Sequence, residues 1–281
     1  MTIAEALQQG KTRLLAGPLV AENAARDAEL LLMHTLRMER ASLMAYPERA
    51  LTATQAEQYA ALIGERLTAM PLQYITGEQE FYGLRFRVTP DVLIPRPETE
   101  HLVEAVLARI ALGTALEIVD VGTGSGAIAV ALAHLLPQSK LTALDLSAAA
   151  LDVARGNAAA HRVIDRVELL QSDLLCAVAS RRFDVVVSNP PYVSLQDADL
   201  LHAQVRHFEP SLALFAGETG FEVCERLIPQ ASNVLAPHGL LAMEIGFGQS
   251  KRMAHLLRGW QNVEFVKDLQ GIDRVALARK G

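Results

Sequence analysis

The chain has 281 residues, of which 51% are hydrophobic and 21% are charged, and its formal net charge is −6. This composition is typical of a folded globular protein and excludes a disordered or collagen-like chain. The length allows one large domain or two smaller ones, and the mildly acidic charge disfavours a protein that wraps duplex nucleic acid.

Cysteine usage and the first residues bear on the cellular compartment. The two cysteines, Cys176 and Cys224, form no C-x-x-C motif, so we expect no disulfide scaffold and no metal site. The N-terminal residues carry acidic and polar side chains and lack the apolar core of a signal peptide. A membrane-spanning helix needs about 18 or more consecutive apolar residues, and no stretch of this sequence approaches that length. We therefore expect a cytoplasmic protein without membrane contacts.

The first part of the chain is expected to be helical. Capping-box spacing occurs at Thr2–Glu5 and at Thr54–Glu57, and apolar side chains then recur on one helix face. A further helix is expected from Ala24 to Leu36, and Pro71 ends the last one. Because this region carries no chemical motif, residues 1–73 are predicted to be a helical bundle that docks the substrate.

The hydrophobic period changes near residue 78. Phe81–Val88 alternates as a hairpin does, with Gly83 at its turn, so residues 74–95 are predicted to be a β-hairpin linker. Two prolines then exclude regular structure across Ile94–Arg96, whereas Pro97 suits the first turn of a helix.

Strand and helix patterns alternate through residues 96–281, which are predicted to form one domain. This alternation predicts an α/β fold with a doubly wound, mostly parallel sheet of seven strands. The last two strands have no helix between them, so they form a hairpin that adds one antiparallel strand. The expected strands are Leu116–Val121, Lys140–Leu144, Arg166–Leu170, Phe183–Ser188, Leu240–Ile245, Val263–Val266 and Arg274–Ala278.

A glycine-rich segment lies where the first of these strands meets its helix. Glycine lets the backbone turn tightly and approach a ligand, while the N–H groups of the helix point at that ligand. Asp145 follows at the end of the next strand, where a carboxylate can accept both hydroxyls of a ribose. The pattern favours an adenosine-containing ligand over a purely structural turn. The loop residues are Gly122, Thr123, Gly124, Ser125 and Gly126.

Two further acidic residues each allow two interpretations. Asp120, just before the loop, would either attract a positively charged group such as a sulfonium or hydrogen-bond the loop itself. Asp173 would either accept from an adenine amino group, with Leu174 packed on the ring, or cap the helix that follows.

The segment Asn189-Pro190-Pro191-Tyr192 follows a predicted strand, at the edge where open α/β sheets bind ligands. Proline fixes φ, so the Pro190 carbonyl is held rigidly, and the Asn189 side chain adds a second acceptor. Two fixed acceptors can hold both hydrogens of one planar NH2 group, which Tyr192 can cover. Such bonds orient a weakly nucleophilic amide or exocyclic amino nitrogen for methyl transfer and stabilise its developing charge. The alternative is a rigid turn after a buried strand.

Together these segments resemble class I S-adenosylmethionine-dependent methyltransferases that modify planar NH2 groups, and more closely the bacterial release factor glutamine methyltransferases. The resemblance covers essentially the whole chain, and its most discriminating segment is Ile94-Pro95-Arg96-Pro97-Glu98-Thr99-Glu100. The other matching segments are Glu80–Gly83, Val119–Gly126, Ser188–Val193, Glu209–Gly217, Glu244–Gly246 and Gly271–Arg274.

For the cofactor, the resemblance implies that residues 122–126 and Asp145 bind S-adenosylmethionine, which leaves as S-adenosylhomocysteine, with no metal involved. Asp173 and Leu174 would lie near the adenine, with weaker stacking because the family often has a bulky aromatic residue where Leu174 stands. Asn189 would also border the cofactor.

For the substrate, the resemblance implies that Asn189, Pro190 and Tyr192 are the catalytic residues. Asn189 and the Pro190 carbonyl would hold the amide of a glutamine, against which Pro191 and Tyr192 pack, and Arg96–Thr99 would line the site. That glutamine would belong to the Gly-Gly-Gln motif of class I peptide chain release factors, so that methylation tunes translation termination.

Three functions are weighed. The first is the protein-glutamine methyltransferase, and the second is a methyltransferase for adenine or cytosine amino groups in nucleic acid. The third, a nucleotide-binding oxidoreductase or a non-catalytic binding module, leaves residues 189–192 unexplained. The acidic charge, the helical first domain and the missing target-recognition insert favour the first, without direct contact to nucleic acid.

Overall fold

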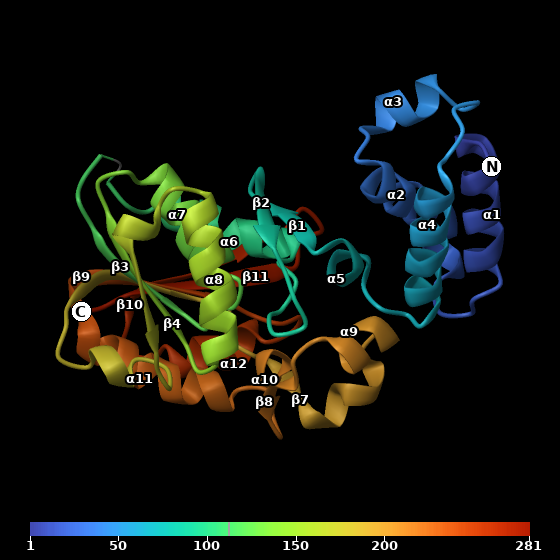
Figure 1. The fold of residues 1–281 in the computed structure, drawn as a ribbon. Coiled ribbons are helices and arrows are strands. Elements are labelled where there is room, and N and C mark those ends of the chain that lie inside the picture. Colours follow the sequence, from blue (N-terminus) through green and yellow to red (C-terminus); the bar gives the residue numbers. More distant parts are fainter. Residues whose placement is uncertain (112) are drawn as a thin grey trace. The chain divides into compact units, whose positions relative to one another are not determined.

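The structure, a computed structural model, describes residues 1–111 and 113–281 (Figure 1). The chain divides into two compact units. The first comprises Met1–Glu78 and Leu201–Phe208, and the second comprises Gln79–Leu200 and Glu209–Gly281. The predicted division into residues 1–73, 74–95 and 96–281 is a functional assignment and stays a prediction.

The first unit is helical and has its own apolar core. Buried side chains of three helices meet in this core, among them Ile3, Leu31, Leu32 and Ile63. A buried ion pair between Arg66 and Asp27, with Nε and Oδ2 2.7 Å apart, ties two of these helices together. The helices are α1 Ile3–Leu15, α2 Ala24–Leu36, α3 Arg40–Ala45, α4 Ala53–Leu67, α5 Leu72–Thr76 and α9 Ala203–Phe208.

One predicted capping box is confirmed and the other is wrong. Thr2 and Glu5 cap α1 reciprocally. In α4, however, Thr52 and Gln55 form the capping box instead of Thr54 and Glu57. Two Thr-x-x-Glu/Gln sequences overlap here, and because α4 begins at Ala53, Thr54 already lies in its first turn.

In the second unit, the predicted hairpin is formed by β1 Glu78–Phe81 and β2 Leu84–Arg87. Its turn has positive φ at Tyr82 (52°) and Gly83 (72°), as a tight two-residue hairpin turn requires. Helix α6 Pro97–Leu107 then begins with Pro97 in its first turn, as expected.

The predicted seven-stranded sheet is confirmed, in the order β10-β11-β9-β6-β3-β4-β5. Six of the seven strands run in the same direction, and only β11 is antiparallel to its neighbours β10 and β9. The strands are β3 Glu117–Val121, β4 Lys140–Asp145, β5 Val167–Gln171, β6 Phe183–Ser188, β9 Leu235–Glu244, β10 Gln261–Lys267 and β11 Asp273–Arg279.

Each face of this sheet is covered by its own set of helices (Figure 1). Successive strand residues alternate between the two cores: Val185 and Val187 lie on one side, and Val186 lies on the other. Helices α6, α7 Ala127–Leu135 and α8 Ala148–Ala160 cover the first side. Helices α11 Glu222–Val234 and α12 Ser250–Leu256 cover the second.

Short elements complete the second unit. β7 Val193–Ser194 pairs in parallel with β8 Phe215–Gly217, and α10 Ser211–Leu214 precedes β8. Within the described parts of the chain, no helix combines the length and apolar character needed to span a bilayer.

The topology places the site. β3 has β4 on one side and β6 on the other, so the strand order reverses at β3. Ligands of doubly wound sheets bind beyond the carboxyl ends of the strands at such a point. The glycine loop and Asn189 follow the ends of β3 and β6, and Asp145 is the last residue of β4, so the sheet brings all three to the same edge.

Candidate active site

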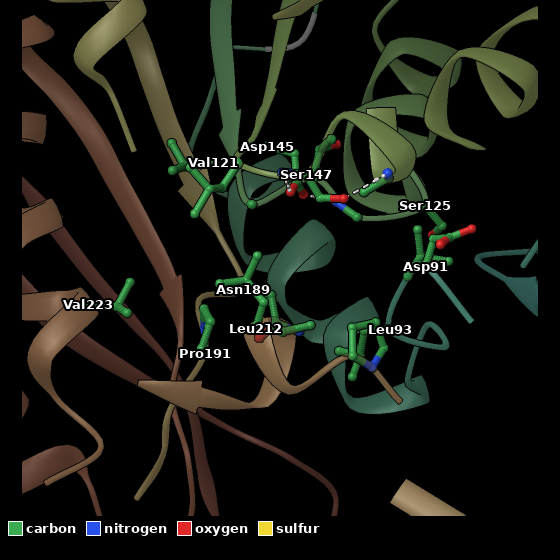
Figure 2. A pocket seen from close by; sticks show the side chains of 18 of the residues that line it. Asp91, Leu93, Val121, Ser125, Asp145, Ser147, Asn189, Pro191, Leu212 and Val223 are labelled. Atoms are coloured by element: carbon green, nitrogen blue, oxygen red, sulfur yellow. Dashed lines mark hydrogen bonds between the residues drawn. The ribbon is translucent and has the colours of Figure 1, made fainter. Parts of the chain in front are cut away.

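A cavity of about 490 Å³ opens at this edge of the sheet (Figure 2). Its size is ordinary for a small-molecule site. The glycine loop and Asp145 contribute to one part of its wall, and Asn189 and Pro191 contribute to another. The remaining wall includes Leu93, Arg96, Thr99, Ser147, Asp173, Leu174, Pro210, Leu212, Val223 and Arg226.

The glycine loop turns sharply between β3 and α7. Gly122, Gly124 and Gly126 have φ of 74°, 55° and 81°, which side chains other than glycine rarely adopt. The backbone N–H groups of Gly122 and Thr123 donate to the Leu144 carbonyl of the neighbouring strand, at 2.8 and 2.9 Å. Residues 122–125 line the cavity.

Gly126 does not line the cavity and instead packs against α8. A Cβ at this position would lie 3.1 Å from Ala154 Cβ, whereas one at Gly124 would meet nothing within 4 Å. Both glycines have positive φ, so an alanine strains the backbone at either position by about 1–2 kcal/mol.

We therefore expect Gly126→Ala to destabilise the fold by about 1 kcal/mol or more beyond Gly124→Ala, because only the former adds overpacking. Urea denaturation of the two variants measures this difference in the free energy of unfolding. Equal stability of the two variants would show that contact with Ala154 does not limit position 126.

Asp145 holds the loop from the end of β4. Its Oδ2 accepts from the Gly124 backbone N–H at 2.8 Å, and its Oδ1 accepts from the Ser147 backbone N–H at 2.9 Å (Figure 2). Burial raises the pKa of this carboxyl. Each carboxylate oxygen has a further lone-pair site, so Asp145 can still accept from a hydroxyl in the cavity.

Of the two interpretations of Asp120, the structure shows the hydrogen bond to the loop. Asp120 is fully buried, and its Oδ2 accepts from Thr123 Oγ1 at 2.7 Å. Its Oδ1 is a buried acceptor that has no partner among the described residues. Burial raises the pKa of Asp120 to about 7.

This shift makes stability depend on pH. The folded state keeps the proton of Asp120 up to about pH 7, whereas an aspartate in the unfolded chain, with its ordinary pKa of 3.8, loses the proton much earlier. The folded state thus binds more protons between about pH 4 and 7, and its contribution to stability falls as pH rises through that range.

We expect Asp120→Asn to flatten this fall, because the asparagine cannot ionise. Thermal unfolding from pH 4.5 to 8 measures it, with the exposed α8 residue changed in Asp152→Asn as control. Wild type and Asp120→Asn losing stability in parallel would contradict the assignment.

Asn189 lies at the end of β6 with its side chain engaged by α6. Its Nδ2 donates to the Thr99 Oγ1 at 3.1 Å, and both residues line the cavity. Thr99 is buried, with 4% of its surface exposed.

The rest of this segment is distributed differently from the prediction. Pro191 lines the cavity, whereas Pro190 is buried and neither Pro190 nor Tyr192 is among the lining residues. The Tyr192 carbonyl accepts from Gln249 Nε2 at 3.1 Å. Burial and the nearby Glu244 raise the pKa of Tyr192. The substrate roles of Pro190 and Tyr192 stay predictions.

Glu244, at the end of β9, is a buried acid to which sequence reasoning assigned no role. Its carboxyl lies near the Thr99 and Tyr192 side chains, and its Oε2 has no partner among the described residues. Burial is the main cause that raises its pKa to about 7. The sequence offered one indication of such a role, because Glu244 is an acidic residue at the end of a long apolar strand.

A second acid, Glu209, joins two segments that line the cavity. Its Oε1 accepts from Arg96 Nη2 at 2.5 Å, and its Oε2 accepts from the Ile94 backbone N–H at 3.4 Å. The Glu209 side chain is 1% exposed and the Arg96 side chain is 32% exposed, so the carboxylate of the pair is shielded from water while the guanidinium is partly open to it. It fixes the proline-rich segment against the chain that leads into α10.

Asp173 and Leu174 line the cavity beyond β5. Of the two interpretations of Asp173, the helix cap is not formed, because the short helix η3 Cys176–Val178 has Leu175 at its N-cap and no side-chain capping hydrogen bond. The Asp173 carboxylate pairs with Arg226 at 2.5 Å. The adenine contact of Asp173 and Leu174 stays a prediction.

Family models and solved structures agree with this architecture. Residues 5–77 match the PrmC N-terminal domain, and residues 98–212 match the methyltransferase small domain. A methyltransferase from Pyrococcus furiosus covers 72% of this chain and 91% of its own, with a TM-score of 0.53 and 19% identity. A T. thermophilus 16S rRNA N2 G1207 methyltransferase in complex with AdoMet and guanosine matches 73% of this chain and 50% of its own length, with a TM-score of 0.54 and 20% identity. The fold and the methyltransferase domain define a class I S-adenosylmethionine-dependent methyltransferase.

Curated relatives narrow this class. Three proteins named release factor glutamine methyltransferase resemble the chain over most of its length. The one from Koribacter versatilis is 49% identical over 90% of both chains. Those from Moorella thermoacetica and Escherichia coli are 42% and 40% identical, over 99% and 92% of this chain and 98% and 93% of their own. The chain belongs to the release factor glutamine methyltransferase family.

Proposed function

We propose that this protein transfers a methyl group from S-adenosylmethionine to the side-chain amide nitrogen of the glutamine in the Gly-Gly-Gln motif of class I peptide chain release factors. The observation that carries the proposal is the position of Asn189, which lines the same cavity as the glycine loop and Asp145. The names of the curated relatives support a release factor as the substrate.

The residues present fit S-adenosylmethionine. The glycine loop lines a cavity of about 490 Å³ together with Asp145, Asp173 and Leu174. We propose that Asp145 accepts the ribose hydroxyls and that Asp173 and Leu174 border the adenine. When bound, this cofactor supplies an electrophilic methyl group on its sulfonium.

The chemistry that remains for the protein is to orient a poor nucleophile. We propose that the Asn189 Oδ1 and the Pro190 carbonyl accept the two N–H groups of the substrate amide, while Pro191 and Tyr192 pack against it. These acceptors stabilise the positive charge that develops on nitrogen. The bound cofactor would supply its methyl group to this nitrogen and leave as S-adenosylhomocysteine, and the extra proton of the amide would pass to solvent.

The proposal extends to the setting of the reaction. It places the protein in the cytoplasm and assigns no role to a metal, a membrane or direct nucleic-acid contact. Residues 1–73 would dock the release factor, and residues 96–281 would catalyse the methyl transfer. Residues 74–95 would connect these two parts.

Incubation with methyl-labelled S-adenosylmethionine tests the proposal. The substrates are a class I release factor, the same factor with its Gly-Gly-Gln glutamine changed to glutamate, and DNA. We expect label only in the unchanged release factor. Label in DNA alone would instead support transfer to a nucleobase amino group.

A further inference from the structure

The orientation of the Asn189 amide decides whether the site can hold a substrate NH2 group. A carboxamide has an acceptor on one side and two donors on the other, and a half-turn exchanges them without a change of shape. Only with Oδ1 toward the substrate does Asn189 provide an acceptor. With Nδ2 there instead, donors would face donors.

A hydrogen bond to Thr99 sets this orientation. The Asn189 Nδ2 donates to Thr99 Oγ1 at 3.1 Å, which leaves Oδ1 free of that contact. The bond joins residues that are 90 positions apart in the chain, one at the end of β6 and the other in the first turn of α6. Pro97 fixes the start of this helix and thereby the place of Thr99.

A threonine hydroxyl alone does not choose between donor and acceptor, because it can be either. In the structure Thr99 Oγ1 accepts from Asn189, so its own proton is available to a second group. The carboxyl of Glu244 lies near Thr99, and its buried Oε2 has no partner among the described residues. In its ionised form this carboxyl can only accept, so it favours the arrangement in which the Thr99 proton points away from Asn189. Thr99 and Glu244 are only 4% and 3% exposed, so little water competes for these bonds.

We propose that Thr99 is a positioning residue which, backed by Glu244, holds Asn189 with its amide oxygen toward the substrate. The inference deepens the proposed function and rests on it. Thr99 need not touch the transferred methyl group, because it acts through Asn189.

Two hydroxyl-free variants, Thr99→Val and Thr99→Ala, test the proposal against Thr99→Ser. In Thr99→Val and Thr99→Ala the productive amide orientation loses its buried hydrogen bond, so we expect kcat for the release factor to fall by about tenfold. Thr99→Ser keeps the hydroxyl and is expected to stay within about threefold of wild type. The S-adenosylmethionine Kd, measured by calorimetry, should change less than about twofold in all three, since the glycine loop and Asp145 are untouched.

Thermal unfolding identifies which variants are folded, and only these are compared. One folded variant of the pair Thr99→Val and Thr99→Ala is sufficient for the test. Wild-type kcat in such a variant would overturn the inference, as would a Thr99→Ser variant as slow as Thr99→Val. A wild-type protein that leaves the release factor glutamine unmethylated would instead defeat the proposed function itself.

Discussion

Asn189→Ala is expected to lower kcat for methylation of the release factor by about 10²–10³-fold, the usual cost of removing one group that stabilises developing charge. The variant loses the acceptor that the structure holds at the cavity wall. S-adenosylmethionine affinity should remain within about twofold, because Asn189 is proposed to act mainly on the substrate amide. Steady-state kinetics give kcat, and calorimetry gives the Kd.

Asn23→Ala serves as the control. Asn23 is exposed in the helical unit, and its side chain makes no capping hydrogen bond to α2. This variant should behave as wild type. If Asn189→Ala lost cofactor affinity in proportion to activity, the side chain would belong to the cofactor site and the assignment to the substrate amide would fail.

Asp145→Ala is expected to weaken S-adenosylmethionine binding by about 1–3 kcal/mol, the cost of losing a charged acceptor. Two causes contribute, because Asp145 is proposed to accept the ribose hydroxyls and is seen to accept from Gly124 and Ser147. Calorimetry with the variant and with wild type gives the difference in binding free energy.

An analogue separates these causes. Wild type should bind S-adenosylhomocysteine more tightly than its 2′-deoxy analogue, and Asp145→Ala should lose this preference, as in a double-mutant cycle. If the variant bound both ligands more weakly and kept the full preference, Asp145 would act only by ordering the loop. Unchanged affinity for both would refute either role.

The sheet was predictable because each strand carries an apolar run and each connection carries a helical pattern. The residues Val185, Val186 and Val187, which alternate between two cores, already indicate a strand buried on both faces. Short or weakly patterned elements escaped prediction. β7 and β8 have two and three residues, and β9 begins at Leu235, ahead of the predicted Leu240, through a stretch with exposed Pro237 and His238.

The site residues that lie at the ends of strands were predictable from the sequence. The glycine loop, Asp145 and Asn189 each end or directly follow a strand, so sequence order alone brought them to one edge. The roles of Thr99 and Glu209 depend on contacts across 90 and 113 positions, which no local pattern reveals. Asp120 and Thr123 are only three positions apart, so their hydrogen bond could be posed as an alternative from the sequence, but the choice depended on how deeply Asp120 is buried.

The central claim is that one glutamine side chain of a release factor receives the methyl group. Mass spectrometry of peptides from a release factor incubated with this protein and S-adenosylmethionine tests it most directly. We predict the added mass of one methyl group on the amide nitrogen of the Gly-Gly-Gln glutamine, and no such product with Asn189→Ala. A methyl group on any other residue, with that glutamine unmodified, would contradict the account.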